Sequence, residues 1–292
     1  MSLIDKQNPI VTFIYFLLTI IITMFTMNPI ILVASFVSSL LLFCLLVGIK
    51  RTLIRICYSL LFILLITIIN PLFSRQGMTE LFAIGSLVVT LESVLNGVAI
   101  GIMLSSVINW ISVLNILLDT DKISYIFSKY TPKIGTILSV SLGLFPKYIV
   151  QYKVIDNNLK GFGIYNNTNV FGKIKLKLHT LSTLISWSIE GALTLSDSMS
   201  ARGYDLKGKR VYNKYKFTPY DILFLLIILS VGILVLVFLG LGISGYYYYP
   251  TFKQIAFDSS IWIYFVIFAF MNFMSCQIVG ESVKWQYLKS KI

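Results

Sequence analysis

Long apolar runs separated by short polar stretches fill both ends of this 292-residue chain. A membrane span needs about 17–25 mostly apolar residues, and six runs have that length. Their middles contain no Lys, Arg or Glu. Lipid cannot hydrogen-bond to open backbone groups, so we expect each run to be a helix. The six predicted spans are residues 10–27, 30–49, 53–69, 97–118, 221–243 and 256–279.

A shorter apolar segment, residues 79–91, lies between the third and fourth predicted spans. It contains Gly85, and Glu80 and Glu92 stand close to its two ends. We therefore expect an interfacial or re-entrant segment rather than a full span. A short seventh crossing remains the alternative, and it would invert the orientation of everything that follows.

The pattern changes in residues 119–216, where apolar positions recur at helical spacing among many charges. We expect three amphipathic helices here, over residues 121–130, 134–160 and 173–202, with a kink at Pro146 in the second. The sequence thus predicts an all-α, polytopic membrane protein in three parts: transmembrane helices in residues 1–118, a cytoplasmic helical region in residues 119–216, and transmembrane helices in residues 217–292. The apolar face of the third amphipathic helix includes Leu178, Leu181, Ile185, Ile189 and Met199.

The distribution of charge sets the predicted orientation. Charged residues make up 12% of the chain, against about 25% in soluble domains. Residues 119–216 hold 15 of the 24 basic groups. Six spans with both termini in the cytoplasm place 22 of the 24 on the inner side, as the positive-inside rule requires. The net charge of +12 is therefore explained by topology, and we expect no nucleic-acid partner.

The chain lacks a recognisable set of catalytic residues. Residues 203–209 match the spacing of a phosphate-binding loop, but Arg210 stands where that loop needs Ser or Thr for magnesium. His179 is the single histidine, so we expect no zinc site. We predict that the chain is not an enzyme, holds no metal or cofactor, and acts through partner proteins.

Two of the predicted amphipathic helices end in similar sequences, Leu159-Lys160-Gly161-Phe162 and Ala201-Arg202-Gly203-Tyr204. A glycine after a cation is typical of a helix C-terminus, where glycine adopts the left-handed conformation and the cation favours the helix dipole. Such an end also projects a guanidinium that can bind carboxylate or carbonyl oxygens of another protein. The two interpretations are compatible.

These residues resemble the transmembrane T component of energy-coupling factor (ECF) transporters, the EcfT/CbiQ family. The most specific part of the resemblance is Ser198-Met199-Ser200-Ala201-Arg202-Gly203-Tyr204. Weaker similarity extends along most of the chain, at Asn70-Pro71-Leu72-Phe73 with Gly77, at Thr90-Leu91-Glu92-Ser93 with Gly97, and at Phe145-Pro146.

In that family two coupling helices each end in Ala-Arg-Gly and dock into grooves on two cytoplasmic ATP-binding-cassette ATPases. The resemblance implies two docking ends here, and the first departs from the family pattern because lysine replaces arginine. A lysine is a point charge and cannot reproduce the arginine fork. The implied docking residues are Ala201, Arg202 and Gly203 at one end, and Leu159, Lys160 and Gly161 at the other.

The resemblance also implies the remaining partners. ATP and magnesium would be bound by the ATPases, and a separate substrate-binding membrane subunit would lie on the apolar faces of the coupling helices. Together they would import a vitamin or a transition-metal ion across a bacterial-type cell membrane. A stand-alone permease or channel without ATPases remains the alternative, and it requires a solute path within the spans.

Overall fold

The computed structural model describes residues 8–74, 77–84, 87–162, 170–204, 217–241, 246–249 and 261–289. The chain divides into two compact units, Met1–Asp119 with Tyr215–Ile292, and Thr120–Lys214. The secondary-structure elements of the described residues are helices apart from one two-stranded hairpin, so the predicted all-α class is confirmed.

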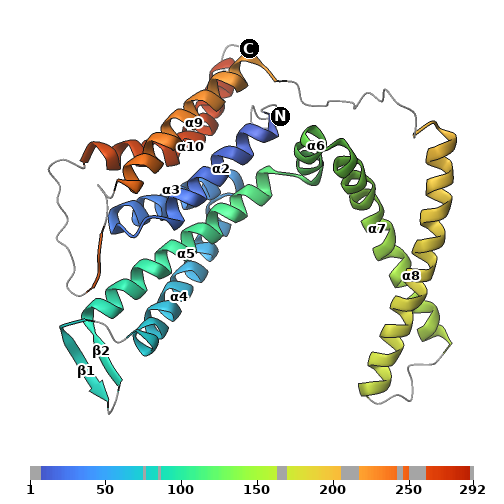
Figure 1. The fold of residues 1–292 in the computed structure, drawn as a ribbon, viewed down its shortest axis with the longest axis horizontal. Coiled ribbons are helices and arrows are strands. Elements are labelled where there is room, and N and C mark those ends of the chain that lie inside the picture. The colour runs from blue at the N-terminus through green and yellow to red at the C-terminus, as the bar shows by residue number, and fades with distance from the viewer. Residues whose placement is uncertain are drawn as a thin grey trace. The chain divides into compact units, whose positions relative to one another are not determined.

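The first unit contains six of the described helices (Figure 1). Two of them start at an asparagine followed by a proline. The Asn8 and Asn28 side chains each accept a hydrogen bond, 3.1 Å long, from the backbone N–H two residues on. Each predicted span corresponds to one of the six helices, namely α2 (Pro9–Met24), α3 (Pro29–Val47), α4 (Ile49–Phe73), α5 (Leu91–Leu117), α9 (Pro219–Gly240) and α10 (Ile261–Lys289).

Six helices in the described residues are long and apolar enough to cross a bilayer, so the protein is a multi-pass membrane protein. The six differ from the predicted set in one place. Helix α2 has 16 residues and a length of about 24 Å, short of the roughly 30 Å of hydrocarbon. The sixth candidate is instead Ile134–Gly161, which the sequence places in the cytoplasm. Its residues 134–146 carry no charge, which explains why it also meets the hydropathy criterion.

The interior of the first unit is built around aromatic rings. Tyr15 and Phe16 of α2 pack edge-on against Trp110 of α5, with ring centroids 6.4 and 5.8 Å away. The indole Nε1 of Trp110 donates a 3.0 Å hydrogen bond to Ser35 of α3. All four side chains are fully buried, which explains how the short helix α2 is held although it falls below spanning length.

The segment 79–91, predicted to be interfacial or re-entrant, forms an antiparallel hairpin of β1 (Glu80–Ile84) and β2 (Leu87–Thr90). Strands of five and four residues cannot cross a bilayer, which needs about 9–11 residues per strand, and the hairpin returns to the side where it began. The buried Glu92 carboxylate accepts a 2.7 Å hydrogen bond from the Thr79 hydroxyl and fastens the hairpin to α5.

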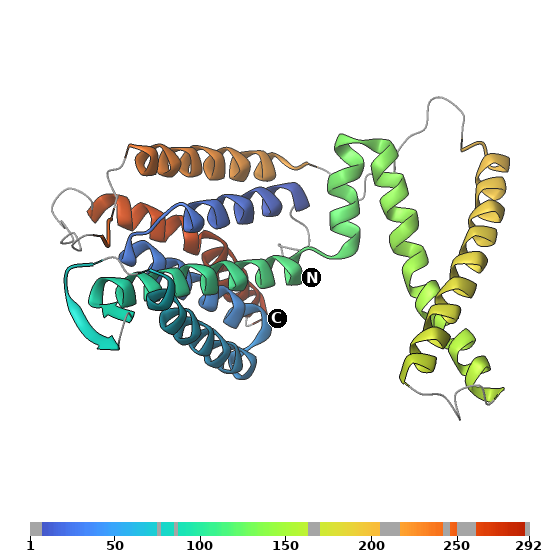
Figure 2. The same ribbon diagram turned by 60° about the horizontal axis from the view of Figure 1, so that its bottom comes forward.

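The second unit contains three helices in its described part, α6 (Thr120–Tyr130), α7 (Pro132–Gly161) and α8 (Val170–Ala201). Helices α6 and α7 meet at a tight corner. A Cβ added to Gly135 of α7 would lie 2.2 Å from the Ser128 Cα of α6, so only glycine fits there. Helices α7 and α8 pack against each other and cross. The start of α7 and the end of α8 diverge (Figures 1 and 2).

Candidate partner-binding site

Helix α8 ends in a Schellman motif built on Gly203. Gly203 has a left-handed φ of +73°, which a glycine adopts without the steric cost of a Cβ. Its N–H donates to the Ser200 carbonyl at 2.9 Å, and the Tyr204 N–H donates to the Met199 carbonyl at 3.0 Å. The predicted helix C-terminus at Gly203 is confirmed. The rest of the near-match to a phosphate-binding loop, residues 205–209, lies outside the described residues.

This turn leaves the Arg202 side chain exposed. Arg202 is exposed, and its guanidinium makes no hydrogen bond or ion pair with any residue that the structure describes. Its backbone N–H donates to the carbonyls of Ser198 and Met199, so the main chain at this position is fixed. A fixed backbone therefore presents five N–H donors and one positive charge at the end of a helix.

Helix α7 ends differently, which corrects the prediction that the two ends are alike. The positive-φ glycines of the described chain are Gly48, Gly77 and Gly203, so Gly161 keeps an ordinary backbone inside the last turn. Phe162 follows as the cap residue, with φ −75°, and its N–H donates to the Asn158 carbonyl at 3.1 Å. The cation at this end is also engaged, because the Lys160 Nζ lies 2.6 Å from the Asp156 carboxylate.

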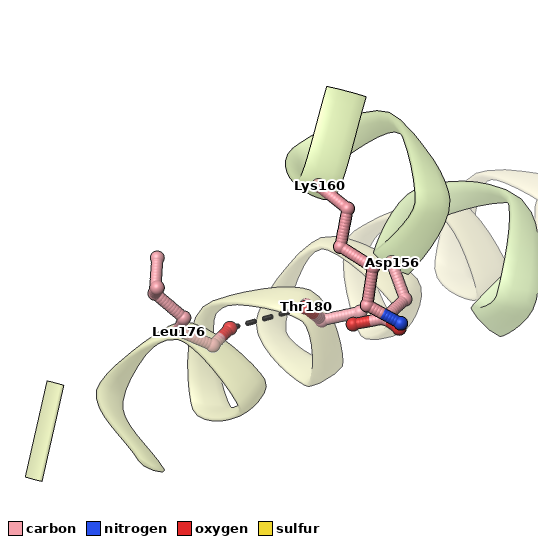
Figure 3. Close-up of polar contacts among 4 residues, drawn as sticks. All are labelled: Asp156, Lys160, Leu176 and Thr180. Carbon is pink, nitrogen blue, oxygen red and sulfur yellow. Dashed lines mark hydrogen bonds and ion pairs between the residues drawn. The ribbon is translucent and has the colours of Figure 1, made fainter. Parts of the chain in front are cut away.

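The two ends also lie far apart within the unit. Helices α7 and α8 are consecutive and cross well inside both helices, where Tyr148 meets Trp187 (Figures 1 and 2). Figure 3 shows the Asp156–Lys160 turn of α7 beside Thr180, in the first third of α8. The 32 residues of α8 extend about 48 Å, so the structure does not bring Lys160 and Arg202 together.

An aromatic contact joins the two helices. The rings of Tyr148 on α7 and Trp187 on α8 pack edge-to-face with centroids 6.0 Å apart. The Lys147 ammonium lies 5.4 Å from the centroid of the same Trp187 ring. Sequence reasoning missed this contact, since neither helix carries a local signal that pairs these residues. The Asp156–Lys160 pair had such a signal, because residues four apart lie on one face of a helix.

The predicted apolar face of α8 is mostly uncovered. Four of its five residues, Leu178, Leu181, Ile185 and Ile189, have between 45% and 60% of their surface exposed. Met199, beside the Schellman turn, is partly buried. This stripe lies on the same helix as Arg202, so α8 carries both an apolar face and a terminal cation.

Comparisons with known proteins do not assign a family to the chain. No protein-family model matches it, and no curated protein matches it significantly.

Proposed function

We propose that this protein is the transmembrane coupling subunit of an energy-coupling factor importer. The observation that supports it best is the end of α8. There an exposed arginine without an intramolecular partner among the described residues stands on a rigid Schellman turn, within the sequence Ala201-Arg202-Gly203 that resembles the EcfT/CbiQ docking motif. The multi-pass membrane character of the chain fits such a subunit.

The proposed role of Arg202 is to dock one ATPase subunit. A guanidinium forms paired, parallel hydrogen bonds with a carboxylate or with neighbouring carbonyls. A side chain that is already ion-paired must first break that contact, whereas Arg202 is available at no such cost. The Schellman turn fixes its Cα, which lowers the entropy lost on docking.

The end of α7 would make the weaker contact. Lys160 is held by Asp156, and an ammonium cannot form the two-pronged contact of a guanidinium. The two ends are separated by most of the length of α8, a spacing compatible with two different ATPase subunits. The proposed assembly is therefore unequal, with its main anchor at Arg202.

The α7–α8 pair would transmit the motion of the ATPases. Tyr148 and Lys147 of α7 contact Trp187 of α8 where the two helices cross. A displacement of the C-terminal end of α8 would therefore also move α7. The exposed stripe from Leu178 to Ile189 would support a separate substrate-binding membrane subunit. ATP and magnesium would be bound by the ATPases, and the imported solute, a vitamin or metal ion, by that separate subunit.

Co-purification tests the proposal. The tagged chain is co-expressed with the energy-coupling ATPase pair encoded in the same genome. We expect the pair to be retained by the wild-type chain and lost on Arg202→Glu. Lys175→Glu is the matched control, since it reverses an exposed charge near the start of the same helix. Retention of the pair by Arg202→Glu, or solute uptake by vesicles containing the chain without ATPases, would contradict the proposal, and the second result would support a permease.

A further inference from the structure

Helices α4 and α5 lie side by side (Figure 1). Their side chains line a pocket that the proposed function does not use. At one end of their contact the helices are very close. A Cβ added to Gly97 or Gly101 of α5 would lie 3.1 Å from the α4 backbone, at Thr67 and Ile63. This is the small-xxx-small packing that brings membrane helices together.

The pocket opens further along the same seam. The next two residues in the α5 stripe are Ser105 and Asn109, and they line a cavity of about 370 Å³ together with α4 residues. The Ser105 hydroxyl donates to the Ser59 carbonyl at 3.4 Å, and the Asn109 amide donates to the Ser59 hydroxyl at 3.5 Å. These buried polar side chains therefore hydrogen-bond with one another behind the pocket, whose accessible lining is mostly apolar.

A partly buried arginine forms one wall of the pocket. The Nε of Arg55 donates to the Asn109 side-chain oxygen at 2.9 Å. Its Nη2 donates to the Ile108 carbonyl at 3.2 Å and to the Ser112 hydroxyl. The other terminal nitrogen, Nη1, donates to no described residue, and no described carboxylate forms an ion pair with this guanidinium. The guanidinium carbon also lies 5.4 Å from the centroid of the Phe43 ring. No carboxylate among the described residues neutralises this positive charge of a membrane helix, and an anion would do so.

The rim of the pocket is apolar and open. Tyr58 and Leu61 of α4 are 69% and 63% exposed, and Ile108 of α5 is 46% exposed. In a multi-pass membrane protein such a rim faces hydrocarbon. An acyl chain can therefore lie along these side chains while its polar head reaches the guanidinium.

The position of Arg55 along α4 matches the depth of lipid headgroups. Arg55 is about 9 Å along a helix that extends about 37 Å, so it lies near the end of the hydrocarbon layer. Arg51 lies one turn earlier, on the same face, and is exposed. The charge distribution places this end of α4 on the cytoplasmic side, where anionic lipids attract basic groups.

We infer that the α4–α5 pocket binds one anionic phospholipid, with its phosphate at Arg55 and an acyl chain over Tyr58 and Leu61. The chemistry recognised is a phosphate, which a lipid headgroup and free inorganic phosphate share. The open apolar rim favours the lipid, because a free anion would leave that surface unused. The inference does not depend on the proposed coupling function.

Native mass spectrometry of the full chain in detergent tests the inference. The protein is incubated with equal amounts of phosphatidylglycerol and phosphatidylcholine. We expect one phosphatidylglycerol to be retained in preference, and Arg55→Gln to reduce that preference about fivefold. Lys50→Gln is the matched control, since it removes a cation at the same end of α4 but on the other side of the helix, and it is expected to change little.

A second variant separates a pocket from a general surface charge. Ile108→Trp fills the rim and leaves Arg55 with all its hydrogen-bond partners, so it should also reduce retention, and it provides the test if Arg55→Gln does not fold. Unchanged retention in Ile108→Trp, or an equal loss in Lys50→Gln, would overturn the inference. Displacement of the lipid by millimolar inorganic phosphate would also overturn it, in favour of a free-anion site.

Discussion

The ends of α7 and α8 have similar sequences, Leu159-Lys160-Gly161-Phe162 and Ala201-Arg202-Gly203-Tyr204, but different structures. In α8 the glycine is left-handed, a Schellman motif closes the helix, and the arginine has no described partner. In α7 the glycine stays in the helix and the lysine is ion-paired. A cation before a glycine therefore does not by itself define a docking end. What matters is whether the turn is closed and whether the charge is available.

Among substitutions that keep the charge or remove a single contact, the largest effect is expected from exchanging the two cations. Arg202→Lys should weaken binding of the ATPase pair about tenfold, because an ammonium keeps the charge but loses the paired hydrogen bonds. Lys160→Arg should change the affinity less than about twofold, because Asp156 can still engage the new side chain. The affinities of the two variants would be measured by titrating the ATPase pair over the immobilised chain. A gain from Lys160→Arg that equals the loss from Arg202→Lys would show that the ends are equivalent.

The next largest effect is expected from substituting the glycine at each helix end, Gly203 and Gly161. Gly203→Ala places a Cβ in the left-handed region, at a cost of about 1–2 kcal/mol, and should speed amide exchange at residues 203 and 204 about fivefold or more. Gly161→Ala should leave exchange in its turn unchanged or slower, because alanine favours a helical position by about 0.5–1 kcal/mol over glycine. Hydrogen exchange with mass spectrometry distinguishes the two. Equal acceleration at both ends would contradict the difference in backbone.

The smallest effect is expected for the ion pair in α7. Asp156→Asn removes a pair with the favourable spacing of four residues, which is worth about 0.2–0.5 kcal/mol in a helix. Thermal unfolding in detergent should therefore change little relative to the wild-type chain. Asp197→Asn, at an exposed position of α8, is the matched control. A destabilisation several times larger than in the control would mean that the α7 end is held by more than this local pair.

Much of the membrane part could be predicted because the bilayer imposes simple rules. Apolar runs of sufficient length must be helical, and each of the six runs corresponds to a helix. The hairpin was missed because its strands are short and apolar, although Val88, Val89 and Thr90 are β-branched residues that favour strands. The amphipathic helix predicted at residues 134–160 also meets the length and hydropathy criteria for a span, and its cytoplasmic setting stays a prediction.

The candidate site could be predicted only in part. The glycine stop at Gly203 follows from local sequence, and so does the pairing of Asp156 with Lys160. Which of the two glycines becomes left-handed depends on where the chain goes next, and four residues do not contain that information. The contact between Tyr148 and Trp187 joins separate helices, so only the three-dimensional fold identifies it.

The most direct test of the central claim compares the charge reversals Arg202→Glu and Lys160→Glu in the same binding assay with the ATPase pair. We expect Arg202→Glu to lower the affinity at least tenfold more than Lys160→Glu, since of the two ends only that of α8 presents an available guanidinium on a closed turn. Equal losses, or a larger loss from Lys160→Glu, would contradict it.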